Sequence, residues 1–81
     1  MKVRISFYSY FKDLTGCPGT SEDVPSGTTL EGLVKRVVAR FPKLEGLQRS
    51  TLIAVGVDYQ SRDYVLKDND EVSFFPPVQG G

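Results

Sequence analysis

The two ends of the chain carry the clearest alternation of apolar and polar side chains. Residues 2–8 place apolar and polar residues on opposite sides of an extended backbone, and residues 71–75 do the same. Period two, carried by β-branched and aromatic residues, is typical of half-buried strands. We therefore expect a strand at each end. In the second strand Val72 and Phe74 face the core, while Ser73 and Phe75 face the other way.

A different period marks the middle of the chain, where residues 28–41 predict one amphipathic helix. Its apolar positions follow the spacing i, i+3, i+4, i+7, i+8, i+11 and are Leu30, Leu33, Val34, Val37, Val38 and Phe41. We expect Thr28 to cap the first free N–H groups, with Glu31 completing a capping box. Pro42 ends the helix.

The remaining segments predict shorter elements. Residues 10–14 suit a helical turn, and residues 20–24 suit a polar strand at a sheet edge, beside the first strand. Residues 52–57 are an apolar run expected inside a sheet. Residues 58–62 suit a turn or a short edge strand. Asn69 lies in a tight turn and tolerates a positive φ.

This order of elements favours an α+β fold, in which one mixed sheet is covered by one main helix. The strands at the two chain ends are expected side by side near its centre. Tyr8 and Phe75 then form an aromatic pair on the face away from the helix. Exposed aromatic residues mark partner surfaces. The competing interpretation is that a loop or the tail covers Phe75.

Composition removes most other functions. The chain has 81 residues, no histidine and the single cysteine Cys17, so it holds no Cys/His zinc site, internal disulfide or self-contained Ser-His or Cys-His nucleophile. Cys17 is interpreted as an incidental loop thiol, and no carboxylates are spaced for acid–base work. The formal net charge is zero, which predicts no nucleic-acid partner. No apolar run approaches the roughly 20 residues of a membrane span, and we expect a cytoplasmic protein.

The carboxyl end is then the remaining chemical feature. Pro76 and Pro77 hold the chain extended after the last strand. Gly80 and Gly81 carry no side chain and suit a slot that only backbone fits. The plain alternative is a frayed terminus without function.

The run from Asp70 to Gly81 resembles the ubiquitin-like sulfur-carrier proteins, and more narrowly the small subunits of molybdopterin synthase. Its sequence is Asp-Glu-Val-Ser-Phe-Phe-Pro-Pro-Val-Gln-Gly-Gly. Residues 7–16 and 29–42 resemble the first strand, short helix and main helix of the family. Asn69 and Lys12 depart from it, where glycine and arginine are common. The resemblance implies a β-grasp domain over residues 1–75 and an extended tail over residues 76–81.

The same resemblance implies a mechanism. A partner adenylyltransferase, using ATP and Mg²⁺, activates the Gly81 carboxylate as an acyl-adenylate. A sulfur donor protein then supplies the sulfur of a Gly81 thiocarboxylate. The large synthase subunit, in a heterotetramer, uses it to convert cyclic pyranopterin monophosphate to molybdopterin. The chain itself is then a non-catalytic subunit that binds no cofactor or metal.

The resemblance also assigns residue roles. Phe75, Tyr8 and Tyr59 form the docking face for the large subunit. The tail contacts the partner through Pro76, Pro77 and Val78, and through Gly80 and Gly81, which enter its active site. The alternatives are a carrier for thiamin thiazole or tungsten cofactor synthesis, and a ubiquitin-like protein modifier joined through Gly81 to lysines.

Overall fold

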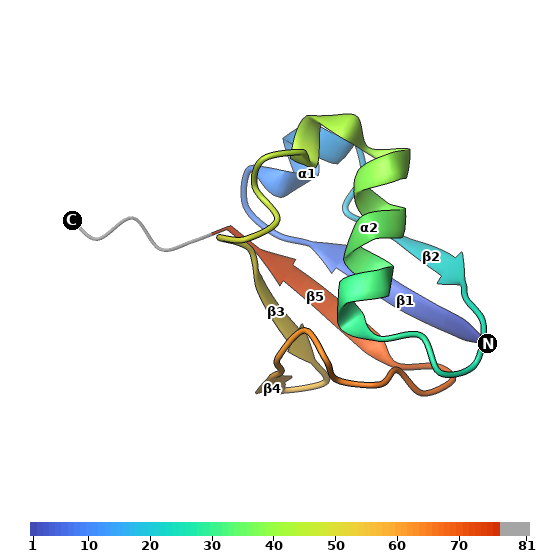
Figure 1. Ribbon diagram of the computed structural model, residues 1–81. Helices are drawn as coiled ribbons and strands as arrows, with labels where there is room; N and C mark the ends of the chain where they lie inside the picture. Colours follow the sequence, from blue (N-terminus) through green and yellow to red (C-terminus); the bar gives the residue numbers. More distant parts are fainter. Residues whose placement is uncertain (77–81) are drawn as a thin grey trace.

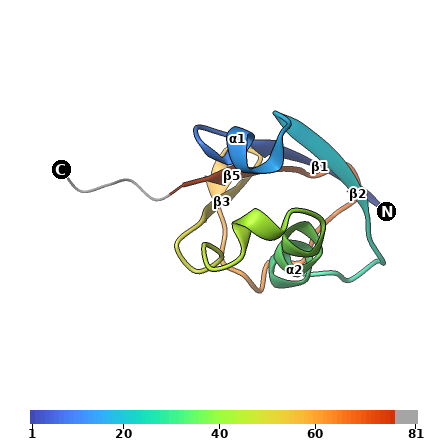
Figure 2. The same ribbon diagram turned by 90° about the horizontal axis from the view of Figure 1, so that it is seen from above.

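The structure is a computed structural model that describes residues 1–76. Its elements are β1 (Lys2–Phe7), α1 (Phe11–Thr15), β2 (Gly19–Asp23), α2 (Leu30–Arg40), the 3-10 turn η1 (Pro42–Leu44), β3 (Leu52–Val55), β4 (Asp58–Tyr59) and β5 (Glu71–Phe75). The strands form one sheet in the order β2-β1-β5-β3-β4 (Figure 1). Viewed from above, α2 lies across one face of this sheet (Figure 2). The predicted β-grasp arrangement is confirmed.

The strands from the two ends of the chain are neighbours at the centre of the sheet, as predicted. β1 and β5 run parallel, with Ile5 beside Val72 and Phe7 beside Phe74. Their alternate side chains are buried under α2, whose own buried residues are Leu30, Leu33, Val34 and Val37. Each fully buried aliphatic side chain contributes about 1.5–3 kcal/mol, so this shared core stabilises the pairing of β1 with β5 under α2.

The prediction for the start of α2 is wrong by one residue. Thr29 is the N-cap, and its hydroxyl accepts a hydrogen bond from the Gly32 N–H at 3.3 Å. The Thr28 hydroxyl instead donates to the Pro25 carbonyl at 2.7 Å, which ties it to the preceding turn. Glu31 is therefore one position too early for a capping box. A Cβ at Gly32 would lie 3.2 Å from Thr28 Cγ2, a close contact that the Thr28 side chain would have to relieve by moving.

The shorter elements largely follow the predictions. α1 ends at Gly16, which adopts φ 76°, and β4 is the predicted short edge strand. The apolar run after residue 51 is shorter as a strand than expected, because Gly56 turns the chain with φ 63°. Val57 consequently lies at an exposed hairpin tip. Asn69 has the expected positive φ, at 67°.

The turn before β5 is fastened to the start of β1. The Asn69 N–H donates to the Lys2 carbonyl at 2.7 Å, and the Lys2 N–H donates to Asp68 Oδ1 at 2.9 Å. Asp70 Oδ2 accepts hydrogen bonds from the Tyr64 hydroxyl at 3.1 Å and the Lys67 N–H at 2.8 Å. Burial raises the pKa of Tyr64 above its ordinary value, and the hydrogen bond and charge of Asp70 raise it further. These contacts set the register in which β5 enters the sheet.

β2 is the predicted edge strand, and Arg40 of α2 reaches across to it. Met1 and Val24 exchange hydrogen bonds, and the Phe7 N–H donates to the Pro18 carbonyl. Because hydrogen-bonded pairs alternate along an antiparallel ladder, the Ser21 carbonyl points toward the free edge. The Arg40 guanidinium donates to that carbonyl at 3.0 Å. It also donates to Glu22 Oε2 at 2.6 Å and Thr20 Oγ1 at 3.0 Å.

Candidate docking surface and tail

The candidate site begins at the carboxyl end of β5, where buried and accessible side chains alternate. Val72 and Phe74 are buried in the core, while Ser73 and Phe75 on the opposite face are only partly buried. This confirms the predicted orientation of the strand. Phe75 is therefore the last strand residue before the tail and keeps part of its ring accessible.

Tyr8 packs directly against Phe75. The parallel register that pairs Phe7 with Phe74 carries Tyr8 alongside Phe75, and the Tyr8 N–H donates to the Phe74 carbonyl at 3.2 Å. The two rings are stacked, with centroids 4.7 Å apart and planes 13° from parallel. Tyr8 stays 44% exposed. The predicted aromatic pair is confirmed, and in the described part of the chain neither ring is sealed into the core.

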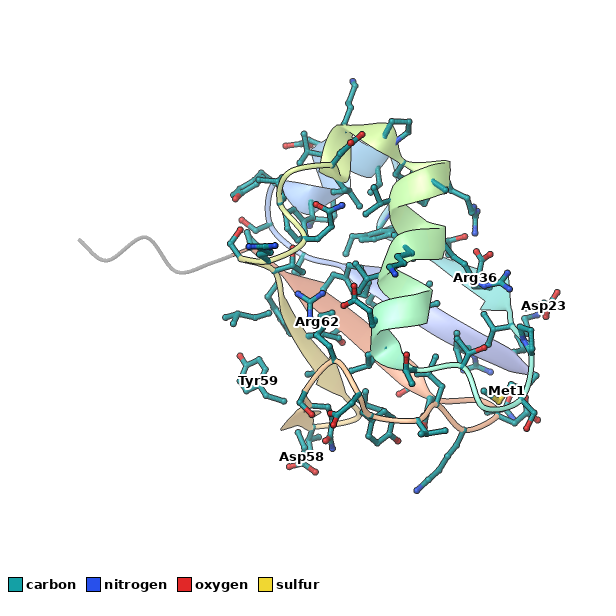
Figure 3. The ribbon with its side chains drawn as sticks, in the orientation of Figure 1. Met1, Asp23, Arg36, Asp58, Tyr59 and Arg62 are labelled. Carbon is teal, nitrogen blue, oxygen red and sulfur yellow. The ribbon has the colours of Figure 1, made fainter. Side chains whose placement is uncertain are left out.

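Tyr59 joins this pair from the edge strand β4. It pairs with Ala54, which in turn pairs with Ser73, so Tyr59 lies on the same face as Phe75. Its ring is 6.2 Å from that of Phe75 at 68°, and the residue is 67% exposed. Figure 3 shows Tyr59 beyond β3, at the outer edge of the sheet. We call Tyr8, Phe75 and Tyr59 the aromatic surface.

Leu52 is an accessible apolar residue that the sequence analysis did not single out. It lies directly across from Phe75 in the antiparallel pairing of β3 with β5, and it is 40% exposed. The run from Leu52 to Val57 is apolar throughout, so its pattern alone does not say which residues leave the core. The alternation of β5, combined with the pairing of β3 and β5, places Leu52 on the same face as Phe75 and would have identified it.

Of the predicted tail residues, only Pro76 falls within the described part of the chain, where it is partly buried. Pro77, Val78, Gly80 and Gly81 lie outside the described residues. Their predicted roles therefore stay predictions, as does the division into a domain of residues 1–75 and a tail of residues 76–81.

Two charged side chains form an ion pair on the same face of the sheet, at the end of β5 away from the aromatic surface. Arg4 Nη1 lies 3.7 Å from Glu71 Oε1, where β1 and β5 begin to pair, and both side chains are largely exposed. A pair of this kind contributes at most about 1 kcal/mol. It borders the open face of the sheet without adding charge to the aromatic end.

A hollow of about 450 Å³ lies on the helix side, lined by Glu31, Val34, Lys35, Gln48, Arg49 and Arg62. Arg62, labelled in Figure 3, donates to the Gln48 carbonyl and, at 3.1 Å, to the Thr51 carbonyl. Its guanidinium is also 3.8 Å from Glu31. Arg62 thus ties the loop before β3 to α2, which is a structural role.

The described residues hold no cluster of three or more metal-ligating side chains. Cys17 is a partly buried free thiol, and its Sγ is 3.8 Å from Thr15 Oγ1. Over residues 1–76 no helix has the length and apolar character needed to cross a membrane. The arrangement that stands out in the described residues is the aromatic surface at the end of β5.

Comparisons with known proteins show which proteins this chain is similar to. The molybdopterin synthase sulfur carrier subunit of Escherichia coli (strain K12) is 34% identical over 83 residues, which cover 98% of this chain and 99% of that protein. SAMP1, the small archaeal modifier protein 1 of Haloferax volcanii, has the same fold with a TM-score of 0.88, at 19% identity and full coverage of both chains.

A second similar structure is a chain in the complex of subunits 1 and 2 of the molybdopterin-converting factor from Helicobacter pylori 26695. It matches with a TM-score of 0.70 at 22% identity, over the full length of both chains. The model of the ThiS family matches residues 5–81 of this chain. The resemblance to ubiquitin-like sulfur carriers is thereby confirmed, and the chain belongs to the ThiS family.

Proposed function

We propose that this protein is the sulfur carrier subunit of a molybdopterin synthase and that Gly81 bears the sulfur. The observation that carries the proposal is the aromatic surface at the base of a tail ending in Gly80-Gly81. The sulfur carrier named among its relatives spans almost the whole chain. The composition leaves no competing set of catalytic side chains, so the chain acts as a reactant held by partner enzymes.

The first step activates a poor electrophile. The Gly81 carboxylate is negatively charged and resonance-stabilised, and it resists nucleophilic attack. A partner adenylyltransferase joins it to the α-phosphate of ATP, with Mg²⁺ balancing charge, and releases pyrophosphate. The acyl-adenylate now has AMP as a good leaving group.

The second step replaces AMP by sulfur. A persulfide on a sulfur donor protein attacks the Gly81 carbonyl carbon, and AMP leaves with the bonding electron pair. A second thiol then attacks the donor-side sulfur of the acyl persulfide, which leaves a thiocarboxylate on Gly81 and a disulfide on the donor. The thiocarboxylate is a nucleophile presented on a narrow backbone tail.

The third step uses this sulfur in the large subunit, which binds the cyclic pyranopterin monophosphate. Two rounds of transfer supply the two sulfurs of the dithiolene. Gly80 and Gly81 give the clearance to enter that active site, and Val78 contacts its entrance. Pro76 and Pro77 restrict the free tail, which lowers the conformational entropy lost on insertion.

Intact-mass analysis tests the proposal. The full chain is incubated with the cognate adenylyltransferase, ATP, Mg²⁺ and a persulfide donor, and the terminal peptide is then examined. We expect one oxygen of Gly81 to be replaced by sulfur, and the product to form molybdopterin with the large subunit. A chain lacking Gly81 is the control and should fold without transferring sulfur.

Other outcomes would assign a different function. Isopeptide adducts between Gly81 and lysines, without a thiocarboxylate, would make the chain a protein modifier. A thiocarboxylate that the large subunit cannot use, while a thiazole-forming enzyme can, would make it a thiamin carrier. Sulfur transfer by the chain lacking Gly81 would overturn the tail mechanism.

A further inference from the structure

Leu52 occupies the position on β3 directly opposite Phe75. In an antiparallel pair, directly opposed residues project on the same face of the sheet with Cβ atoms about 4.5–5.5 Å apart. Tyr8, the residue directly after β1, stacks on Phe75 from the other side. Tyr8, Phe75 and Leu52 thus form one row across β1, β5 and β3, with Tyr59 beside it.

Leu52 is the exposed residue of its strand. Ile53 and Val55 face the core, and Ala54, on the same face as Leu52, is buried, whereas Leu52 remains 40% exposed. A serine or threonine would fill the same position without presenting apolar surface to water. The leucine therefore enlarges an accessible apolar area that already contains three aromatic rings, as partner surfaces do.

The length of the tail limits how far from this row a partner that binds Gly81 can be. Gly81 lies six residues beyond Phe75, and a fully extended chain spans at most about 3.3–3.6 Å per residue. A protein that brings Gly81 into its active site must therefore approach within roughly 20 Å of Phe75. Leu52 is the immediate neighbour of Phe75, so such a protein comes close to both.

We propose that Leu52 is a docking residue for sulfur transfer, covered by an apolar, uncharged patch of the large synthase subunit when the tail is inserted. This inference rests on the proposed function. Leu52 extends the contact that Phe75 makes with the partner, and it does not touch the reacting atoms. Its contribution is therefore to affinity for the partner and leaves the chemical step at bound Gly81 unchanged.

The test compares Leu52→Lys and Leu52→Ala with Val65→Lys. Val65 is also apolar and exposed, at 52%, but it bridges to Thr29 at the start of α2, away from the row. Lysine has an aliphatic stem that a strand accepts. If Leu52→Lys fails to fold, Leu52→Ala still tests the contact. Each variant is prepared with a chemically installed terminal thiocarboxylate, so the activation step is bypassed.

We expect Leu52→Lys to raise the Kd for the large subunit more than about tenfold, because its ammonium loses water without gaining a partner. Leu52→Ala should raise it about fivefold, through lost apolar contact. Val65→Lys should leave it unchanged. In transfer assays the KM for the carrier should rise with the Kd, while the single-turnover rate at saturating carrier stays at the wild-type value.

Wild-type affinity in both Leu52 variants, with normal sulfur transfer by the wild type, would overturn this inference and leave the proposed function standing. A slower single-turnover rate at saturation would also overturn it, because Leu52 would then act on the chemical step. A wild-type thiocarboxylate that neither binds nor serves the large subunit would instead overturn the proposed function.

Discussion

Phe74 and Phe75 are identical side chains in adjacent positions with opposite surroundings. Phe74 is buried beneath α2 and makes an edge-to-face contact with Phe7, with centroids 5.8 Å apart. Phe75 lies on the other face, between Tyr8 and Tyr59. Because successive side chains of a strand point to opposite faces, one ring lies in the core and the other lies in the aromatic surface.

Replacing Phe75 by alanine should therefore weaken partner binding far more than folding. We expect the Kd for the large subunit to rise more than about tenfold, as for a central aromatic anchor. The matched variant Phe74→Ala should lose about 3–5 kcal/mol of unfolding free energy through the cavity it leaves. Calorimetric titration and denaturant unfolding measure the two effects. Unfolding of Phe75→Ala as severe as that of Phe74→Ala would place Phe75 in the core.

Asn69 shows a residue whose role follows from its backbone. The family resemblance leads us to expect a glycine at this position, and the structure gives Asn69 a φ of 67°. Asparagine is among the few other residues that adopt the left-handed region readily. The departure is therefore conservative in conformation, and the turn into β5 is kept.

At the scale of elements, β2 is an edge strand whose free side is partly closed by Arg40. The strand is short and polar, which already discourages pairing with another chain. The Arg40 side chain adds a physical block, because it occupies the outward carbonyl of Ser21 and holds Glu22 and Thr20 beside it. α2 thus protects the edge as well as covering the core.

Arg40→Ala should expose this edge. We expect a loss of about 1 kcal/mol in unfolding free energy from the missing hydrogen bonds. We also expect self-association at high concentration, through the freed backbone groups of β2. Sedimentation velocity over a concentration series measures it, with Arg36→Ala, on the same helix, as the matched control. An Arg40→Ala chain that stays as monomeric as the control would show that the edge needs no such cover.

The start of α2 illustrates why the sequence places elements better than their ends. Thr28 and Thr29 are both good N-caps by residue type. Which threonine caps the helix depends on the Pro25 carbonyl, which accepts a hydrogen bond from the Thr28 hydroxyl. Pro25 lies in a turn whose geometry the local sequence pattern does not determine. The apolar stripe of the helix, by contrast, depends only on period and is correctly predicted.

For the whole molecule, the fold and two of the three residues of the aromatic surface follow from the sequence. Alternation in the first and last strands predicts both the Tyr8–Phe75 contact and its face. Tyr59 could be included only by resemblance, and Leu52 was not included. Both depend on the register of β3 against β5 and β4, which is set by long-range pairing.

The proposed division of the chain into a folded body of residues 1–75 and a reactive tail of residues 76–81 predicts how a shortened protein behaves. A chain ending at Pro76 keeps every described contact, so its thermal midpoint should match that of the full chain. It should still bind the large subunit through the aromatic surface, but with no sulfur to give. In transfer assays we expect it to inhibit the thiocarboxylated full chain competitively. Unfolding of the shortened chain would show that the tail contributes to the core.

The parallel pairing of β1 with β5 has a consequence for how the protein matures. Nearly the whole chain separates Phe7 from Phe74, so this pairing has high contact order and closes late in folding. During synthesis β1 emerges first and must wait for the final strand, because Tyr8 gains its stacking partner only when Phe75 appears. A nascent or truncated chain lacking β5 therefore lacks the stack of Tyr8 on Phe75. Under the proposed function, a partner would meet the complete aromatic surface only on a chain whose last strand is in place.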